Sequence, residues 1–268
     1  MHMKKSFILI VTLIIVIGLF YTRLSLTLVS IGMIAAFIGT LAGGGGLITI
    51  PAMMLVGIPI HTGIATNKFS TGIAALSSIF YLLYQQELRL ASILKYVTIA
   101  FTGGVCGALL TIAMSEQIMN MIACLLLILV LFLTLKRIEW AAQSDENETK
   151  QGYLLWQPFL IAVYDGGFGP GSSTFSILHY LCQHYSYIKA VQLTRVLLFG
   201  SCTGAFLVFY QSGFIQWKYA IAMAVGSIIG SQLGLLVLPK IPIKAAKILL
   251  TLIISLLLIQ VIVKILTT

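Results

Sequence analysis

Two cationic residues of this chain lie inside long apolar stretches, where a charged side chain is energetically expensive. Lys68 falls within residues 62–84 and Arg195 within residues 188–210. At 1.5 Å per helical residue each lies about 10 Å into its stretch. Ionisable side chains buried at such depth in a membrane usually serve a function, and a cation there would bind an anion. The alternative is that both side chains extend to the membrane surface.

Two glycine-rich breaks form the second feature that could do chemistry. Residues 41–51 read LAGGGGLITIP, and residues 163–175 read VYDGGFGPGSSTF. Glycine permits positive φ and a close approach of the backbone to a ligand. A helix that begins after such a break directs its unpaired N–H groups toward it, so two such helix N-termini that meet would favour an anion. Close helix packing is the alternative role, and we prefer it for Gly103, Gly107, Gly226 and Gly230.

The candidate substrate-binding residues come from the two breaks and the two cationic stretches. They are Gly43, Gly44, Gly45, Gly46, Thr66, Asn67, Lys68, Gly167, Gly169, Gly171, Ser172, Ser173, Thr194 and Arg195. Asp165 adjoins the second break, where it could neutralise Arg195 or carry a coupling proton. His61, His179 and His184 lack partners at ligand spacing, so we expect no metal and no cofactor.

The composition places these residues in a polytopic membrane protein. The chain has 268 residues, of which 59% are hydrophobic and only 9% charged. A soluble protein with a polar surface does not have this composition. The net charge of +9 is scattered among apolar stretches, so it reports topology and gives no indication of nucleic acid.

The elements that must position the candidate residues are apolar helices in two related halves. GIATNKF (63–69) pairs with AVQLTRV (190–196), which sets Lys68 opposite Arg195. We expect an N-terminal transmembrane helix in 1–23, a first repeat in 24–135, a polar linker in 136–152 and a second repeat in 153–268. The expected spans are 6–22, a broken element 24–57, 62–84, 92–114, 118–135, a broken element 153–184, 188–210, 217–238 and 242–266.

The distribution of Lys and Arg indicates how the broken elements lie. If each doubles back as a hairpin, most basic loop residues face the cytoplasm, whereas a single crossing would leave most of them outside. The hairpin arrangement gives each repeat a hairpin plus three spans. The two halves then enter from opposite sides, so we expect an all-α inverted repeat with a cytoplasmic N-terminus in the cell membrane.

Two motifs also resemble a known family. AGGGGLITIP followed by the TNK of 66–68, and later VYDGGFGPGSSTF, are similar to the signature stretches of the TauE/SafE sulfite exporter family of membrane permeases, over about residues 24–266. The resemblance implies transport of sulfite, sulfonates or other small sulfur-containing or organic anions. It also implies that Asn67, Lys68, Thr194 and Arg195 line the substrate path. The serines at 172 and 173, where many relatives have a further glycine, and the extra helix 6–22 depart from the family pattern.

We therefore expect a secondary transporter that moves a small anion, such as a sulfur oxyanion or organosulfonate, by alternating access. The resemblance favours export, coupled to protons or to the membrane potential. An anion channel or an organic-acid permease with the same site is the alternative, and a homodimer is left open. The sequence contains neither GxSxG nor HExxH, which argues against a membrane-embedded enzyme. A purely structural subunit would not need two intramembrane cations.

Overall fold

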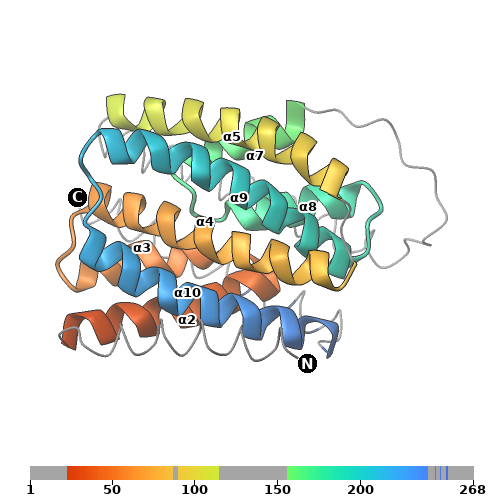
Figure 1. Ribbon diagram of the computed structural model, residues 1–268, viewed down its shortest axis with the longest axis horizontal. Coiled ribbons are helices and arrows are strands. Elements are labelled where there is room, and N and C mark those ends of the chain that lie inside the picture. The colour runs from red at the N-terminus through yellow and green to blue at the C-terminus, as the bar shows by residue number, and fades with distance from the viewer. Residues whose placement is uncertain are drawn as a thin grey trace.

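The computed structural model describes residues 23–86, 90–114 and 156–240, together with positions 245, 248 and 252. Within these ranges the chain is all-helical, as predicted (Figure 1). The predicted spans 6–22 and 118–135, the linker 136–152 and nearly all of the span 242–266 lie outside the described residues. The described elements are α2 (Arg23–Ala42), α3 (Gly45–Leu55), α4 (Ile60–Tyr84), α5 (Leu90–Ala113), α7 (Trp156–Gly167), α8 (Ser172–Cys182), α9 (Tyr187–Gln211), α10 (Trp217–Val237) and the short 3-10 helix Leu238–Lys240.

Four of these helices are long and apolar enough to cross a membrane. The qualifying segments are Ser25–Ala42, Ile93–Ala113, Tyr187–Gln211 and Trp217–Lys240. Helix α4 is as long as α9, at 25 residues, but it has more polar residues, and its Asn67, Lys68 and Ser70 are all buried. Helices α4 and α9 pack on each other inside the bundle, so the cationic residues of both lie away from lipid (Figure 1).

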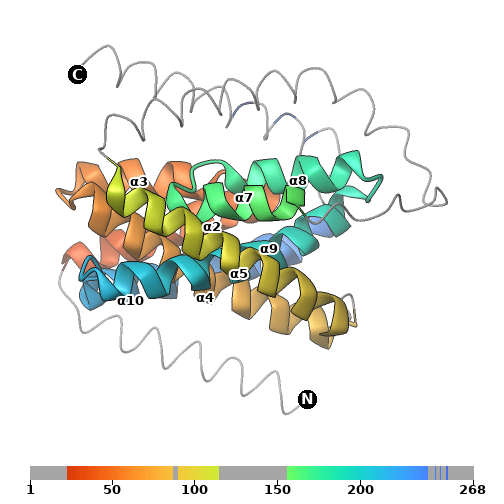
Figure 2. The ribbon, with the colours of Figure 1, turned by 90° about the horizontal axis from the view of Figure 1, so that it is seen from above.

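Both predicted breaks are present, and each separates two helices. The first lies between α2 and α3 and the second between α7 and α8. Gly44 and Gly171 precede the second helix of each pair with φ of 80° and 76°, the left-handed region that favours glycine. Helices α3 and α8 have 11 residues each, about 16 Å at 1.5 Å per residue. Each is too short to cross the roughly 30 Å hydrocarbon core by itself. In Figure 2 these two short helices and α7 lie in one row.

The helix bounds follow the same order in the two halves. Helices α3 and α8 have equal lengths, as do α4 and α9, and Lys68 and Arg195 are each the ninth residue of their helix. The packing is exchanged between the halves: α2 packs on α10 whereas α7 packs on α5, and α5 packs on α9 whereas α10 packs on α4. These correspondences agree with a repeat. The inversion of one half relative to the other stays a prediction.

Small residues allow the exchanged pairs to approach closely. On α5, a Cβ at Gly103 would lie 2.8 Å from the Phe159 carbonyl oxygen of α7. On α10, a Cβ at Gly226 would lie 2.9 Å from the Met33 nitrogen of α2. Gly107 and Gly230 make the same kind of backbone contact one turn further on. The predicted packing role of these four glycines is confirmed.

Candidate functional site

The two glycine breaks meet inside the bundle. The backbone N–H of Gly44 donates to Ser173 Oγ at 3.0 Å. A Cβ at Gly43 would lie 2.6 Å from Thr174 Oγ1, and one at Gly46 would lie 3.6 Å from the Gly169 carbonyl oxygen. The N-termini of α3 and α8 therefore lie side by side, as the glycine pattern predicts.

A cavity of about 40 Å³ opens where these N-termini meet. A single water needs roughly 10–15 Å³ by this measure, so the cavity has room for a few waters or a small ion. Its wall comes from α2, α3, α4, α7, α8, α9 and α10, and thus from both halves of the chain. The lining residues are Ala35, Ala36, Gly39, Gly45, Gly46, Thr49, Asn67, Thr71, Ala74, Asp165, Gly169, Ser172, Ser173, Arg195, Leu198 and Ser227.

Arg195 brings a buried positive charge to the cavity wall. Its side chain is 4% exposed, and its Nη2 donates to the carbonyl oxygen of Gly39 at 2.8 Å. Its Nε finds no hydrogen-bond partner among the described residues. A buried guanidinium with an unpartnered N–H is a donor in need of an acceptor, and an anion in the cavity would supply one.

Lys68 lies behind the cavity wall in a buried ion pair. Its Nζ lies 3.2 Å from Asp165 Oδ1, and both side chains are almost fully buried. Nζ also donates to the backbone carbonyl of Asp165. Of the two roles considered for Asp165, neutralisation of Arg195 is wrong, because the carboxylate pairs with Lys68 of the other half. The role of Asp165 in proton coupling stays a prediction.

Both cations contact the ends of the helices that precede the breaks. Arg195 donates to Gly39 in the last turn of α2, and Lys68 donates to Asp165 in the last turn of α7. The carbonyls of a last turn have no partner within their helix and carry the negative end of its dipole. The C-terminal ends of α2 and α7 therefore attract the two cations, while Arg195 also lines the cavity at which the N-termini of α3 and α8 meet.

Asp165 is the centre of a buried hydrogen-bond network. Ser172 Oγ donates to Oδ1 at 2.5 Å, Ser201 Oγ donates to Oδ2, and Cys202 Sγ lies 3.5 Å from Oδ2. Ser201 and Cys202 did not stand out in the sequence, because they belong to α9 and reach Asp165 only through tertiary packing. Their position two turns after Arg195 on the same helix was the one available signal.

Asn67 connects α3 to α4 at the opposite wall. Its Oδ1 accepts hydrogen bonds from Thr49 Oγ1 at 2.8 Å and from Thr71 Oγ1 at 3.3 Å. With the acceptor so occupied, the side-chain amide nitrogen lies on the side of Gly46, where an added Cβ would be 3.4 Å from Nδ2. Asn67 therefore fixes the first turn of α3 relative to α4.

The structure divides the predicted site residues into those that line the cavity and those that lie behind it. Gly45, Gly46, Asn67, Asp165, Gly169, Ser172, Ser173 and Arg195 are lining residues; Gly43, Gly44, Thr66, Lys68, Gly167, Gly171 and Thr194 are not. Several of the latter have identifiable packing roles: Thr194 Oγ1 donates to Ala190 at 2.8 Å, and Gly167 packs against Thr111 of α5.

Several residues of the cavity lining were not predicted from the sequence. They are Ala35, Ala36, Gly39, Thr71, Ala74, Leu198 and Ser227. Alanine, serine and threonine are common at helix contacts in membranes, so these positions carry no distinctive signal. The helical spacing within two sets was the only signal, because it places each set on one helix face. The first set is Ala35, Ala36 and Gly39, and the second is Asn67, Thr71 and Ala74.

Comparison with known proteins gives consistent matches over most of the chain. The family model described as Sulfite exporter TauE/SafE matches residues 28–261. A probable membrane transporter protein, ORF9, from Sinorhizobium sp is 36% identical over 75% of this chain and 78% of its own. One from Haemophilus influenzae is 34% identical over 76% of this chain and 81% of its own. The probable membrane transporter protein YfcA of Escherichia coli is 30% identical over 76% and 77%. No solved structure gives a significant match.

Proposed function

Because the chain belongs to the sulfite exporter TauE/SafE family of membrane transporters, we propose that it is a secondary transporter of a small oxyanion, namely a sulfur oxyanion or organosulfonate. The observation that carries the proposal is the meeting of two helix N-termini at a cavity that contains the buried Arg195 guanidinium. Helix N-termini and guanidinium groups are the two devices that proteins use most readily for oxyanions.

Hydrogen-bond donors line the cavity on several sides. Ser172 and Ser173 begin α8, and Arg195 faces them from α9. The three oxygens of a sulfite or sulfonate group could accept from the Ser173 hydroxyl, whose proton is not used by its bond from Gly44, from the guanidinium and from the first N–H groups of α3 and α8. A site of this kind selects a compact group with several acceptor oxygens.

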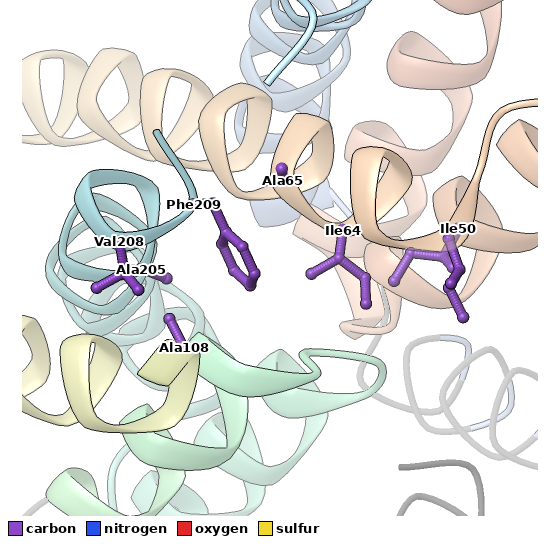
Figure 3. Close-up of a cluster of buried hydrophobic side chains, with 8 residues drawn as sticks. Ile50, Ile64, Ala65, Ala108, Ala205, Val208 and Phe209 are labelled. Atoms are coloured by element: carbon purple, nitrogen blue, oxygen red, sulfur yellow. The ribbon is translucent and has the colours of Figure 1, made fainter. Parts of the chain in front are cut away.

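Two apolar clusters flank the cavity along the central helices, and we propose that they are the gates of alternating access. The first gate cluster is Ile50, Ile60, Ile64, Ala65, Ala108, Ala205, Val208 and Phe209 (Figure 3). The second gate cluster is Leu41, Ile177, Tyr180, Ala190, Val191, Leu235 and Leu238. Each combines residues from both halves of the chain.

The order of residues along α4 and α9 supports this assignment. On α4, Ile64 of the first gate cluster is followed by Asn67 at the cavity and then by Tyr81, which packs against the second gate cluster. On α9 the order is reversed: Val191 of the second gate cluster, then Arg195 at the cavity, then Val208 of the first. Separation of one cluster at a time would expose the cavity to one side of the membrane at a time.

We propose export, in keeping with the family description, with the N-terminus in the cytoplasm and the two halves inverted relative to each other. Asp165 lines the cavity and pairs with Lys68, so a proton on this carboxylate would weaken the pair. Coupling then runs through a proton on Asp165 or through the membrane potential.

Counterflow in proteoliposomes tests the proposal. Vesicles loaded with unlabelled sulfite should accumulate labelled sulfite transiently, with saturation, because a transporter exchanges anions across one alternating site. Arg195→Gln should abolish this uptake. The control is Lys218→Gln, which removes a positive charge from the exposed start of α10. Flux without stimulation from the opposite side would favour a channel, and no protein-dependent flux of sulfite, sulfonates or small carboxylates would refute the proposal.

A further inference from the structure

We infer that this site selects anions with a single negative charge over those with two, and that Asp165 sets this limit. The inference rests on the proposed function, because it assigns the charge of the substrate that binds in the same cavity. Two observations support it: the charges of Arg195, Asp165 and Lys68 at the cavity, and the hydrogen-bond partners of the Asp165 carboxylate.

The formal charge at the cavity is small. Among the residues that the structure describes, Arg195 and Asp165 are the charged ones of the lining, and Lys68 pairs with Asp165 directly behind it. All three side chains are nearly fully buried, so water screens them weakly. Two cations and one carboxylate leave a net charge of one positive unit.

The partial charges of the helix ends around the cavity leave this net charge nearly unchanged. Helices α3 and α8 direct their N-termini toward it, and α2 and α7 direct their last turns to Arg195 and Lys68. Each helix end carries the equivalent of about half a charge, positive at N-termini and negative at C-termini. Two ends of each sign largely cancel, and the formal charge dominates.

The surroundings of Asp165 are those of an ionised carboxylate. The Lys68 ammonium can only donate hydrogen bonds, and the hydroxyls of Ser172 and Ser201 donate to the two carboxylate oxygens. In this arrangement, with donors on both oxygens, the carboxylate repels a second negative charge in the cavity.

A monovalent oxyanion therefore matches the cavity, whereas a divalent one does not. A sulfonate or hydrogen sulfite would bring the total to zero. Sulfate would leave one negative charge uncompensated inside the membrane, which is costly. The inferred ligands are thus singly charged tetrahedral or pyramidal oxyanions.

Calorimetric titration with methanesulfonate and sulfate tests the inference, because the two ions have similar shapes and keep their charges near neutral pH. The wild-type protein should bind methanesulfonate at least about tenfold more tightly than sulfate. Asp165→Asn raises the net charge to two positive units and should reduce this ratio by about tenfold or reverse it. The double variant Lys68→Met, Asp165→Asn restores a net charge of one and should regain the wild-type ratio.

The outcomes separate the inference from the proposed function. Equal affinity for both ions in the wild type, or an unchanged ratio in Asp165→Asn, would overturn the inference while leaving an anion transporter in place. No binding of either ion, or of sulfite, would count against the proposed function itself. If Asp165→Asn does not fold, Thr71→Lys adds the same positive charge at the cavity wall without disturbing the ion pair, and it must shift the ratio in the same direction.

Discussion

Replacement of Gly43 by alanine should separate the two breaks that form the cavity. Gly43 has a φ of +81°, and the Cβ of an alanine would lie 2.6 Å from Thr174 Oγ1 and 2.7 Å from the Thr174 backbone nitrogen. Neither contact is tolerable, and the second is with backbone that cannot rotate away. The first break must therefore move away from α8. This movement either pulls Ser173 along or breaks the hydrogen bond from the Gly44 N–H to Ser173 Oγ.

The loss of unfolding free energy in Gly43→Ala has two contributions. A left-handed conformation costs an alanine about 1–2 kcal/mol. Overpacking against rigid neighbours adds about 1–3 kcal/mol. Gly57 provides a matched control, because its φ is +83° and an added Cβ would meet nothing within 4 Å. Gly57→Ala should therefore lower the free energy of unfolding by only the first contribution.

Reversible unfolding with sodium dodecyl sulfate would measure the two variants, and sulfite titration would measure their anion affinity. We expect Gly43→Ala to be less stable than Gly57→Ala by about 1–3 kcal/mol. It should also bind sulfite more weakly, whereas Gly57→Ala should bind it normally. Equal stability and equal affinity in the two variants would show that the breaks do not meet as described.

Three further experiments test other parts of the site. Arg195→Gln should weaken sulfite binding by about 10- to 100-fold, since hydrogen bonds to charged groups contribute about 1.5–3 kcal/mol, and a calorimetric Kd within twofold of wild type would contradict the site. Ser173→Ala should cost about 1–3 kcal/mol of unfolding free energy by leaving the Gly44 N–H buried without its acceptor at 3.0 Å, unlike Ser30→Ala, which removes an exposed hydroxyl. Single cysteines at Ile64 and Val191, one in each gate cluster, should react with a membrane-impermeant thiol reagent from opposite sides, and reaction of both from the same side would exclude the gate assignment.

The bounds of many helices could be predicted from the sequence, because glycine runs and long apolar stretches determine the local backbone structure. The expected span 62–84 is α4 at Ile60–Tyr84, and 188–210 is α9 at Tyr187–Gln211. The break predicted from GGGG lies at Gly43 and Gly44. These features depend on backbone freedom and on the length of apolar sequence, both of which can be read directly from the residues.

The partners of the charged residues could not be predicted in the same way. Because Asp165 and Arg195 both belong to the second half, their pairing was one of the two roles considered for Asp165. The exchanged packing of the halves instead brings Lys68 of the first half to Asp165, and Arg195 to Gly39. Which helix end a side chain reaches depends on how α4 and α9 pack on α7 and α2, and no local pattern encodes that choice.

The exchange of cations between the halves has a consequence for biogenesis. Lys68 and the Asp165 carboxylate that neutralises it are separated by 97 residues in the chain, so α4 enters the membrane well before α7 is synthesised. During that interval the ammonium has no Asp165 to pair with, and the Gly39 carbonyl has its hydrogen bond from the Gly43 N–H but not the one from Arg195. The first half should therefore be a poor membrane protein when made alone, and co-expression of the two halves as separate chains should rescue both.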